Sequence, residues 1–194
     1  MAITFITLTL QNFKSHRDLT VNFGEVTKIT ADNAKGKSSI MESISWLLYG
    51  TDVIGSKLDP TPINYESEGT MVSLLFSLGG KQVLLGRELH KGKTQYYINE
   101  IPSKAGSFKE ILDQLFDKNL FLSLFNPNYF FTLHWEDQRE MLLKYVTAPA
   151  SKEVLNHMLD EQKKCLEPLL KKHSLNDLEE LHKDNKKKKD KQYI

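Results

Sequence analysis

Hydrophobic and polar residues alternate along the first part of the chain, which is the pattern of strands with one buried face. Within residues 3–10, Ile6 and Leu8 fall on one side, while Thr7 and Thr9 fall on the other. This alternation predicts a half-buried strand.

A second strand is predicted after a polar break at residues 12–17. Leu19, Val21 and Phe23 alternate with polar residues, and Gly24 then favours a turn. Two strands connected by a short polar segment are therefore expected at the start of the chain.

A third strand, a loop and a helix are expected to follow in that order. Val26 and Ile29 suit a short buried strand that leads into the loop. Apolar residues then recur at helical spacing, and Gly50 stands where a helix C-terminus favours glycine. The apolar residues of this predicted helix are Ile40, Ile44, Leu47 and Leu48.

Three further strands are predicted beyond a turn-rich surface excursion at residues 51–69. Their separators, Leu78-Gly79-Gly80 and Lys91-Gly92-Lys93, resemble hairpin turns. The expected strands are Met71 to Ser77, Gln82 to Arg87 and Thr94 to Ile98.

One helix and one aromatic, strand-like stretch are predicted next. The residues from Ser107 to Phe116 predict a helix with Ser107 as its N-cap and Glu110 three residues later. The residues from Leu120 to Leu133 are typical of a strand that Asn126-Pro127-Asn128 interrupts.

From Glu136 to the end the chain favours helices. Pro149 and Pro168 are expected to interrupt them, and Ser151 is expected to begin a new helix as its N-cap. The final charge run, KDNKKKKDK, is typical of a solvated helix face or a frayed tail.

The length of 194 residues fits one domain with an appendage, which we expect at residues 1–148 and 149–194. The content of 40% apolar and 26% charged residues is typical of a soluble globular protein. A net charge of +1 means that any basic surface has to be local. The single cysteine, Cys165, cannot form an internal disulfide, which fits a reducing cytoplasm. We therefore expect a cytoplasmic protein, nucleoid-associated if bacterial, with no membrane partner.

The loop before the predicted helix has a phosphate-binding pattern. Gly36, Lys37 and Ser38 complete G-x-x-x-x-G-K-[ST], in which Ala31 takes the position of the first glycine. A loop that leads into a helix N-terminus offers backbone N–H groups and the positive end of the helix dipole. In this pattern Lys37 reaches the β- and γ-phosphates of a triphosphate, and the Ser38 hydroxyl binds Mg²⁺. The alternative is a solvated Gly-Lys-Ser turn, but the flanking strand and helix favour the phosphate loop.

The order of these elements resembles the N-terminal lobe of the SMC, RecF and SbcC-type ATPases, the ABC-like ATPases of chromosome maintenance and DNA repair. The segments that resemble it are LTLQNFKSH, a strand ending in VNF, and ITADNAKGKSSIMESISWLLYG. The resemblance implies an α/β fold, namely the N-terminal half-head of a P-loop NTPase. An antiparallel β-meander would cover its nucleotide side, and C-terminal helices would lead toward a coiled coil.

The family's loop has the pattern G-x-N-G-x-G-K-S-[ST], from which this chain departs at Ala31 and Ala34. The family also has an N-F-[RK]-S-H element, which taken alone would be a polar turn. By the resemblance its Lys14 and Ser15 contact the α-phosphate and ribose side of ATP, while His16 is either part of the site or a solvated side chain. The residues that the resemblance assigns to ATP are Lys14, Ser15, Asn33, Ala34, Lys35, Gly36, Lys37, Ser38 and Ser39.

The alanine at position 34 has an energetic consequence. If the backbone there is left-handed, alanine costs about 1 to 2 kcal/mol relative to glycine. That corresponds to a roughly tenfold loss of nucleotide affinity. Nucleotide binding is therefore expected to be weakened and not abolished.

The family also uses a glutamine that bonds Mg²⁺ and the attacking water, and the resemblance implies its position near residues 120–133. No glutamine stands there. Asn126 or Asn128 could substitute as a shorter amide, or Gln138 if the alignment shifts. We expect Ser38 and Asn126 as the Mg²⁺ ligands of the chain.

The motifs needed for hydrolysis are absent from the sequence. There is no apolar strand ending in Asp-Glu and no L-S-G-G-x segment. The resemblance implies that a C-terminal lobe, from the same or another polypeptide, supplies the Walker B carboxylates and signature motif. It implies as further partners a second head, an SbcD-like nuclease, and DNA through the assembled complex. Lys91, Lys93 and Lys104 could contact a DNA backbone, or they are solvated turn lysines.

Two functions therefore remain open. In the first, the chain is the ATP-binding N-terminal half of an ATPase for DNA double-strand-break repair or recombination. In the second, it is a short stand-alone protein that pairs through strand edges with a full-length ATPase of this type and inhibits or modulates it. A small-molecule kinase would need a phosphate-acceptor site, for which the sequence offers no candidate.

Overall fold

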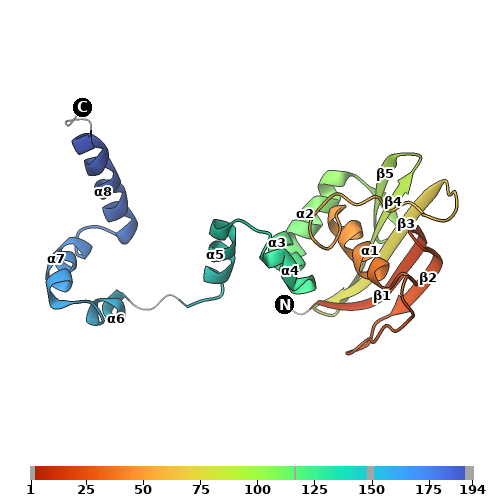
Figure 1. Cartoon of the computed structure of the whole chain (residues 1–194), viewed down its shortest axis with the longest axis horizontal. Coiled ribbons are helices and arrows are strands. Elements are labelled where there is room, and N and C mark those ends of the chain that lie inside the picture. Colours follow the sequence, from red (N-terminus) through yellow and green to blue (C-terminus); the bar gives the residue numbers. More distant parts are fainter. Residues whose placement is uncertain (1–2, 116, 148–150, 191–194) are drawn as a thin grey trace. The chain divides into compact units, whose positions relative to one another are not determined.

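A six-stranded sheet with helix α1 (Lys37–Tyr49) packed on one face forms the centre of the first part of the chain (Figure 1). The structure is a computed structural model that describes residues 3–115, 117–147 and 151–190. Its contacts divide the chain into two units, residues 1–144 and 145–194, which are described separately.

The sheet has the strand order β2-β1-β3-β4-β5-β6, and every neighbouring pair is antiparallel. Its first two strands form a hairpin, and the chain returns after α1 to add β3 on the other side of β1. The bounds are β1 Ile3–Phe13, β2 His16–Asn22, β3 Gly69–Leu78, β4 Lys81–His90, β5 Lys93–Ile98 and β6 Ile101–Ser103.

The core forms between this sheet, α1 and helix α2 (Ala105–Leu115). The four apolar residues that the helical spacing indicated in α1 are all buried, as predicted. Their neighbours in the core are Leu8, Leu10 and Phe13 of β1, Val72, Leu74 and Phe76 of β3, Leu85 of β4, and Phe108 and Leu112 of α2. Burial of these side chains is the main source of stability for the layer that presents α1.

The C-terminal end of α1 is fixed as the sequence predicted. Gly50 takes a left-handed conformation with φ 72°, and its N–H donates to the Trp46 carbonyl at 2.8 Å. The Arg87 guanidinium of β4 donates to the same carbonyl and to the Tyr96 hydroxyl, the latter at 2.8 Å. It also lies over the rings of Trp46 and Tyr96. Arg87 therefore ties the end of α1 to strands β4 and β5.

The strand predicted at Val26 and Ile29 is not formed. Among the described residues no strand pairs with residues 24–36, so two strands and not three precede the loop. Val26 is 90% exposed and Ile29 is 39% exposed. A strand is held by backbone hydrogen bonds to a neighbour, and the described chain offers this segment none.

The meander at residues 69–98 agrees with the prediction. Strands β3, β4 and β5 contain the three predicted ranges, and left-handed Gly79, Gly80 and Gly92 lie in the two turns. Strand β6 was not predicted, because the turn before it is made by Asn99 and Glu100 in left-handed conformations and contains no glycine.

The N-cap predicted at Ser107 is wrong. Helix α2 begins at Ala105, so Ser107 lies inside its first turn. The backbone had already entered the helix there, since the Phe108 N–H donates to the Lys104 carbonyl at 3.1 Å. The predicted end of this helix, Phe116, lies outside the described residues.

The strand predicted between Leu120 and Leu133 is also wrong, because this stretch is helical. Helices α3 (Lys118–Phe125) and α4 (Pro127–Phe130) fill most of it. The Asp117 carboxylate caps α3 by accepting from the Leu120 N–H at 3.1 Å, and the Asn126 side chain caps α4. The ring of Phe121 stacks on Phe125, a helical neighbour, and also contacts Tyr49 of α1. Capping and aromatic packing therefore outweigh the strand propensity of these residues.

The second unit contains helices α6 (Ser151–Asn156), α7 (Asp160–Leu170) and α8 (Leu175–Asp190). The predicted break at Pro168 is displaced, because α7 continues through this proline and ends two residues later. Helix α6 begins at Ser151, and Pro149 lies outside the described residues. The charge run as far as Asp190 lies on the exposed part of α8, which is a solvated helix face, and its last residue, Lys191, lies outside the described residues. Continuation into a coiled coil stays a prediction.

Within the described residues, no helix combines the length and the apolar character that crossing a membrane would require.

We predict that Asp117 makes the stability of the first unit pH-dependent. The hydrogen bond from the Leu120 N–H holds the pKa of this carboxyl below its usual value, and Lys144 at 3.3 Å acts in the same direction. The stabilisation is complete above the unfolded-state pKa of about 3.9 and is lost as the pH falls through the lower folded-state pKa. Asp117→Asn retains a capping side chain without the charge. It should therefore lose less stability than the wild type on acidification from about pH 6 to about pH 3.

Urea unfolding followed by circular dichroism measures this difference. Asp18→Asn on β2 is the matched control, since Asp18 is an exposed carboxylate with no capping bond of this kind. Equal pH dependence in the wild type and in Asp117→Asn would contradict the prediction.

Candidate functional site

The start of α1 is open to an anion. Gly36 is the N-cap residue, and it offers no side chain to the N–H groups of the first turn. The first turn also contains no acidic residue. The partial positive charge of the helix N-terminus is therefore not neutralised by a side chain of its own first turn.

Lys37 closes the loop that precedes the helix. Its Nζ donates to the carbonyls of Ala31 at 2.6 Å and Asp32 at 2.7 Å. The ammonium is thus held at the mouth of the loop by two uncharged acceptors, and it has three N–H donors in all. An arriving phosphate would offer a charged acceptor in place of neutral carbonyls, and charge-assisted bonds are the stronger ones.

Two residues of the loop take left-handed conformations. Ala34 has φ 63° and Gly36 has φ 82°. The condition that the sequence analysis set for position 34 is therefore met, and alanine there costs about 1 to 2 kcal/mol relative to glycine. The loop keeps its shape in spite of this strain.

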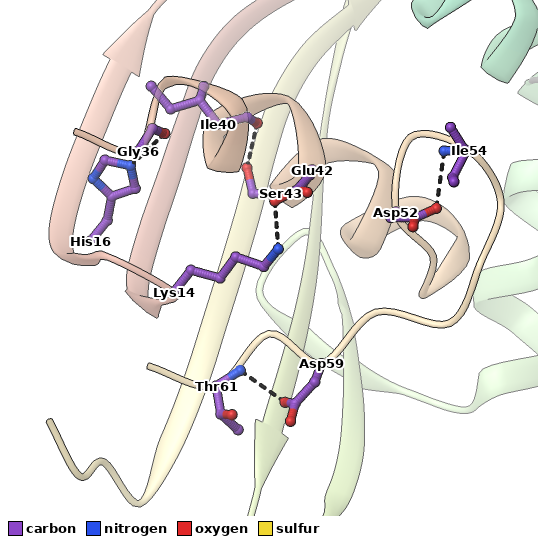
Figure 2. A network of polar contacts seen from close by, with 10 residues as sticks. All are labelled: Lys14, His16, Gly36, Ile40, Glu42, Ser43, Asp52, Ile54, Asp59 and Thr61. Atoms are coloured by element: carbon purple, nitrogen blue, oxygen red, sulfur yellow. Dashed lines mark hydrogen bonds and ion pairs between the residues drawn. The ribbon is translucent and has the colours of Figure 1, made fainter. Parts of the chain in front are cut away.

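The turn between β1 and β2 packs directly against the loop. A Cβ atom added to Gly36 would lie 2.3 Å from Ser15 Oγ and 2.6 Å from His16 Nε2. The ring nitrogen Nε2 of His16 also lies 3.0 Å from the Gly36 carbonyl oxygen, a hydrogen bond that Figure 2 shows. A side chain at position 36 would therefore force Ser15 and His16 to move, and the left-handed φ also favours glycine there. The structure brings Ser15 and Gly36 together.

His16 is a residue for which the sequence alone left two interpretations open. It is half-buried and hydrogen-bonded to the phosphate loop, so it is not a solvated turn residue. Its carbonyl also accepts from the Tyr65 hydroxyl at 3.3 Å, and Arg17 lies over the Tyr65 ring. The signal for this role was its position in the N-F-K-S-H element.

Lys14 is engaged by a residue that the sequence analysis did not single out. Its Nζ lies 2.6 Å from Glu42 Oε2, on the second turn of α1 (Figure 2). The Lys14 backbone N–H donates to the Pro60 carbonyl at 3.0 Å, which joins the turn to the surface excursion. The sequence does place Glu42 on the same face of α1 as Ser38, because the two residues are four positions apart. It gives no indication that Lys14 reaches this face.

The remaining predicted ligands of the loop lie at its surface. Asn33, Lys35 and Ser38 are exposed, whereas Ser39 is buried under the first turn of α1.

Three lysines, Lys91, Lys93 and Lys104, are the candidates for contact with a DNA backbone. Lys91 forms an exposed ion pair with Glu68, in which Nζ and Oε2 are 3.7 Å apart. A surface pair of this kind contributes little to stability.

Asn126 has a local structural partner at both ends of its amide. Its Oδ1 accepts from the Asn128 N–H and its Nδ2 donates to the Val53 carbonyl, both at 3.2 Å. Gln138 likewise donates to the Leu133 carbonyl at 2.8 Å. No contact among the described residues joins either amide to the phosphate loop. Their role toward Mg²⁺ stays a prediction.

The exposed Ser38 hydroxyl fits the protein's share of an Mg²⁺ site. In the described part of the chain no cluster of three or more His, Cys, Asp or Glu side chains could hold a metal ion. Beside nucleotides, phosphates and water supply most of the ligands of Mg²⁺, and the protein supplies one or two.

An apolar groove of about 720 Å³ lies along one side of this unit. It is bordered by the first residues of β1, the exposed segment that leads to the loop, α1 and α3. Its apolar lining includes Ile3, Phe5, Phe23, Ile29, Met41 and Leu124.

The chain matches the AAA domain family over residues 7–194. It is 32% identical over 167 residues to the DNA repair protein RecN of Aquifex aeolicus, covering 85% of this chain and 27% of RecN. It is 25% identical over 182 residues to the DNA double-strand break repair Rad50 ATPase of Methanococcus maripaludis, covering 84% of this chain and 17% of Rad50. The chain therefore spans about a quarter or less of the length of these relatives.

The fold is similar to that of a solved structure. The recombination mediator protein RecF with ATP has a TM-score of 0.50 and 24% sequence identity, over 59% of this chain and 31% of RecF. The chain thus has a known α/β architecture. The chain is a member of the AAA domain family and represents the N-terminal region of an SMC/RecF/SbcC-type ATPase.

Proposed function

We propose that the chain is the ATP-binding N-terminal half of an ATPase head that acts in DNA double-strand-break repair or recombination. The observation that supports this most is the loop in which Lys37 stands at the mouth of an uncapped helix N-terminus, with Ser15 and His16 packed against Gly36. The names of the relatives, a DNA repair protein and a double-strand break repair ATPase, point to the same process.

In this proposal each residue of the loop has a defined task. Lys37 exchanges its bonds to the Ala31 and Asp32 carbonyls for the β- and γ-phosphates of ATP. The first-turn N–H groups of α1 receive phosphate oxygens, and Ser38 supplies a hydroxyl to the Mg²⁺ that neutralises the phosphates. Asn126 is the amide that we propose as a further Mg²⁺ ligand, which requires release of its cap on α4.

Hydrolysis requires groups that this sequence lacks. We propose that a C-terminal lobe, in the same or another polypeptide, brings the Walker B carboxylates and that a second head brings the signature motif. The exposed segment of residues 24–32 and the adjoining apolar groove are the surfaces that would receive the lobe, since both expose groups that pairing would bury. An SbcD-like nuclease and DNA belong to the assembled complex in this proposal. Cytoplasmic placement rests on the single cysteine, Cys165.

A second candidate is a stand-alone protein that inhibits or modulates a full-length ATPase of this type. The specific observation in its favour is the strained Ala34, because a loop released from selection for tight nucleotide binding tolerates such a residue. In this case the groove would receive the C-terminal lobe of the other protein. The two candidates differ in whether the chain takes part in ATP hydrolysis, since the second does not hydrolyse ATP whether or not its loop binds nucleotide.

We predict that Lys37→Ala weakens ATP binding by about tenfold to a hundredfold. The change removes charge-assisted bonds, each of which contributes about 1.5 to 3 kcal/mol. Titration of a fluorescent ATP analogue onto the chain with Mg²⁺ measures the effect. Lys109→Ala, on the exposed face of α2, removes the same charge elsewhere and should leave the affinity unchanged. Identical titration curves for the wild type and Lys37→Ala would refute ATP binding at this loop.

We also predict that Ala34→Gly tightens ATP binding by up to about tenfold, because glycine raises the fraction of free chains that hold residue 34 in the left-handed conformation expected around bound ATP. Ala31→Gly is the matched control, since Ala31 is the other departure from the family's loop but does not have positive φ. The same titration distinguishes the two variants. An affinity of Ala34→Gly at or below that of the wild type would count against the proposed geometry of bound ATP.

The groove gives a third prediction. Leu124→Glu places a charge on a groove side chain that is 76% exposed, so the chain should still fold. The partner in this test is a co-expressed C-terminal lobe, taken from an ATPase of the same genome, that contains the signature and Walker B motifs. The variant should no longer associate with this lobe, because binding would bury the unpaired charge of the introduced carboxylate. Ile101→Glu, at a 67% exposed position of β6 outside the groove, is the control. Size-exclusion chromatography with light scattering measures association, and equal complex formation by both variants would exclude the groove as the interface.

A further inference from the structure

The ion pair between Lys14 and Glu42 links the turn of the β1–β2 hairpin to α1. Its two charged atoms, Nζ and Oε2, are 2.6 Å apart, and the side chains are only 18% and 23% exposed. Solvent therefore screens this pair less than it screens the surface pairs of the chain, such as Lys91 with Glu68.

The pair lies close to the place where nucleotide phosphates would bind. Glu42 follows Ser38 by one helical turn on the same face of α1, which is about 6 Å along the helix axis. The two residues after Lys14 pack against Gly36, at the N-terminus of the same helix. Figure 2 shows Lys14 and His16 extending from one turn, the first toward Glu42 and the second toward Gly36.

The Lys14 ammonium therefore has two possible acceptors within one helical turn. One is the Glu42 carboxylate, which holds it in this structure, and the other is a phosphate at the loop. If Lys14 moves to a phosphate, Glu42 remains half-buried without its counter-ion and close to further negative charge. Both effects oppose nucleotide binding.

We propose that Glu42 lowers and thereby sets the nucleotide affinity of this loop by competing with phosphate for Lys14. The inference rests on the proposed ATP-binding function and adds a residue to it. Binding is an exchange in which the bond from Lys14 to the carboxylate breaks and a bond from Lys14 to a phosphate oxygen forms. Glu42 is thus a residue that tunes affinity, and it is not itself a ligand of the nucleotide.

A purely structural role for the pair makes the opposite prediction. If Glu42 only clamps the hairpin to the helix, its neutralisation would loosen the site and weaken binding. If Glu42 competes for Lys14, neutralisation frees the lysine and strengthens binding. The sign of the change in affinity therefore separates the two roles, and a thermal melt records any loss of clamping independently.

The test compares ATP binding by the wild-type chain with that of three variants, Glu42→Gln, Lys14→Ala and the double variant. We expect Glu42→Gln to tighten binding about fivefold, which corresponds to about 1 kcal/mol. Lys14→Ala should weaken binding, and adding Glu42→Gln to it should give much less than the fivefold gain, because the lysine for which Glu42 competes is gone. Glu110→Gln, an exposed position on α2, controls for the change in net charge.

Failure of this inference differs from failure of the proposed function. If the wild type binds ATP, Lys37→Ala does not, and Glu42→Gln binds no more tightly than the wild type, the competition is refuted while ATP binding stands. An equal gain from Glu42→Gln with and without Lys14 would also refute it, because the gain would then come from general charge repulsion. If neither the wild type nor Glu42→Gln binds ATP, the proposed function itself fails.

Discussion

The close packing of Gly36 between the β1–β2 turn and the start of α1 is the constraint on which the candidate site depends. A side chain at this position would collide with Ser15 and His16, and the left-handed backbone there turns the chain into the helix. The same contact fixes the loop relative to the sheet. At the other end of α1, the Trp46 carbonyl accepts from the Gly50 N–H and from Arg87 of β4, which also bonds Tyr96 of β5. The helix is thus anchored at both ends, so its N-terminus faces a fixed direction.

This anchoring explains how a loop with a strained alanine keeps its shape. The backbone at Ala34 is left-handed, and a sparsely populated conformation of this kind persists only when its surroundings determine it. Here the surroundings are the Lys37 ammonium, which joins two carbonyls at the start of the loop, and the hairpin turn, which covers its end. The strain is confined to residue 34, whereas the contacts that hold the loop come from Lys37 and from the β1–β2 turn of the sheet.

The sequence predicted those elements that depend on local pattern. Helix α1 and strands β3 to β5 have regular apolar spacing, clear glycine signals at their ends and a partner within the described chain. The segment at Val26 and Ile29 has the composition of a strand but pairs with no strand of the described residues. The stretch that includes Phe121 and Phe125 has strand-forming residues, yet capping by Asp117 and packing on α1 make it helical. Local propensity gives way to tertiary context in both cases.

The candidate site also contains some residues that the sequence predicted and some contacts that only the structure reveals. Gly36, Lys37 and Ser38 were found from their spacing, because the chemistry of phosphate binding constrains residue type and order. The partner of Lys14 could not be found in this manner, since Glu42 meets it only after the hairpin folds onto the helix. The contact from His16 to the Gly36 carbonyl has the same origin. Sequence order therefore predicts candidate ligands, whereas the contacts that restrain those residues depend on the fold.

The exposed segment that leads into the loop has a consequence for how the chain behaves before any partner arrives. Its backbone pairs with no strand of the described chain, and its Val26 is nearly fully exposed beside a hydrophobic groove, so an extended peptide of suitable sequence could pair with this segment. At high concentration the nearest such peptide is the equivalent stretch of another copy. Self-association of the isolated chain through this segment would therefore compete with binding of a partner.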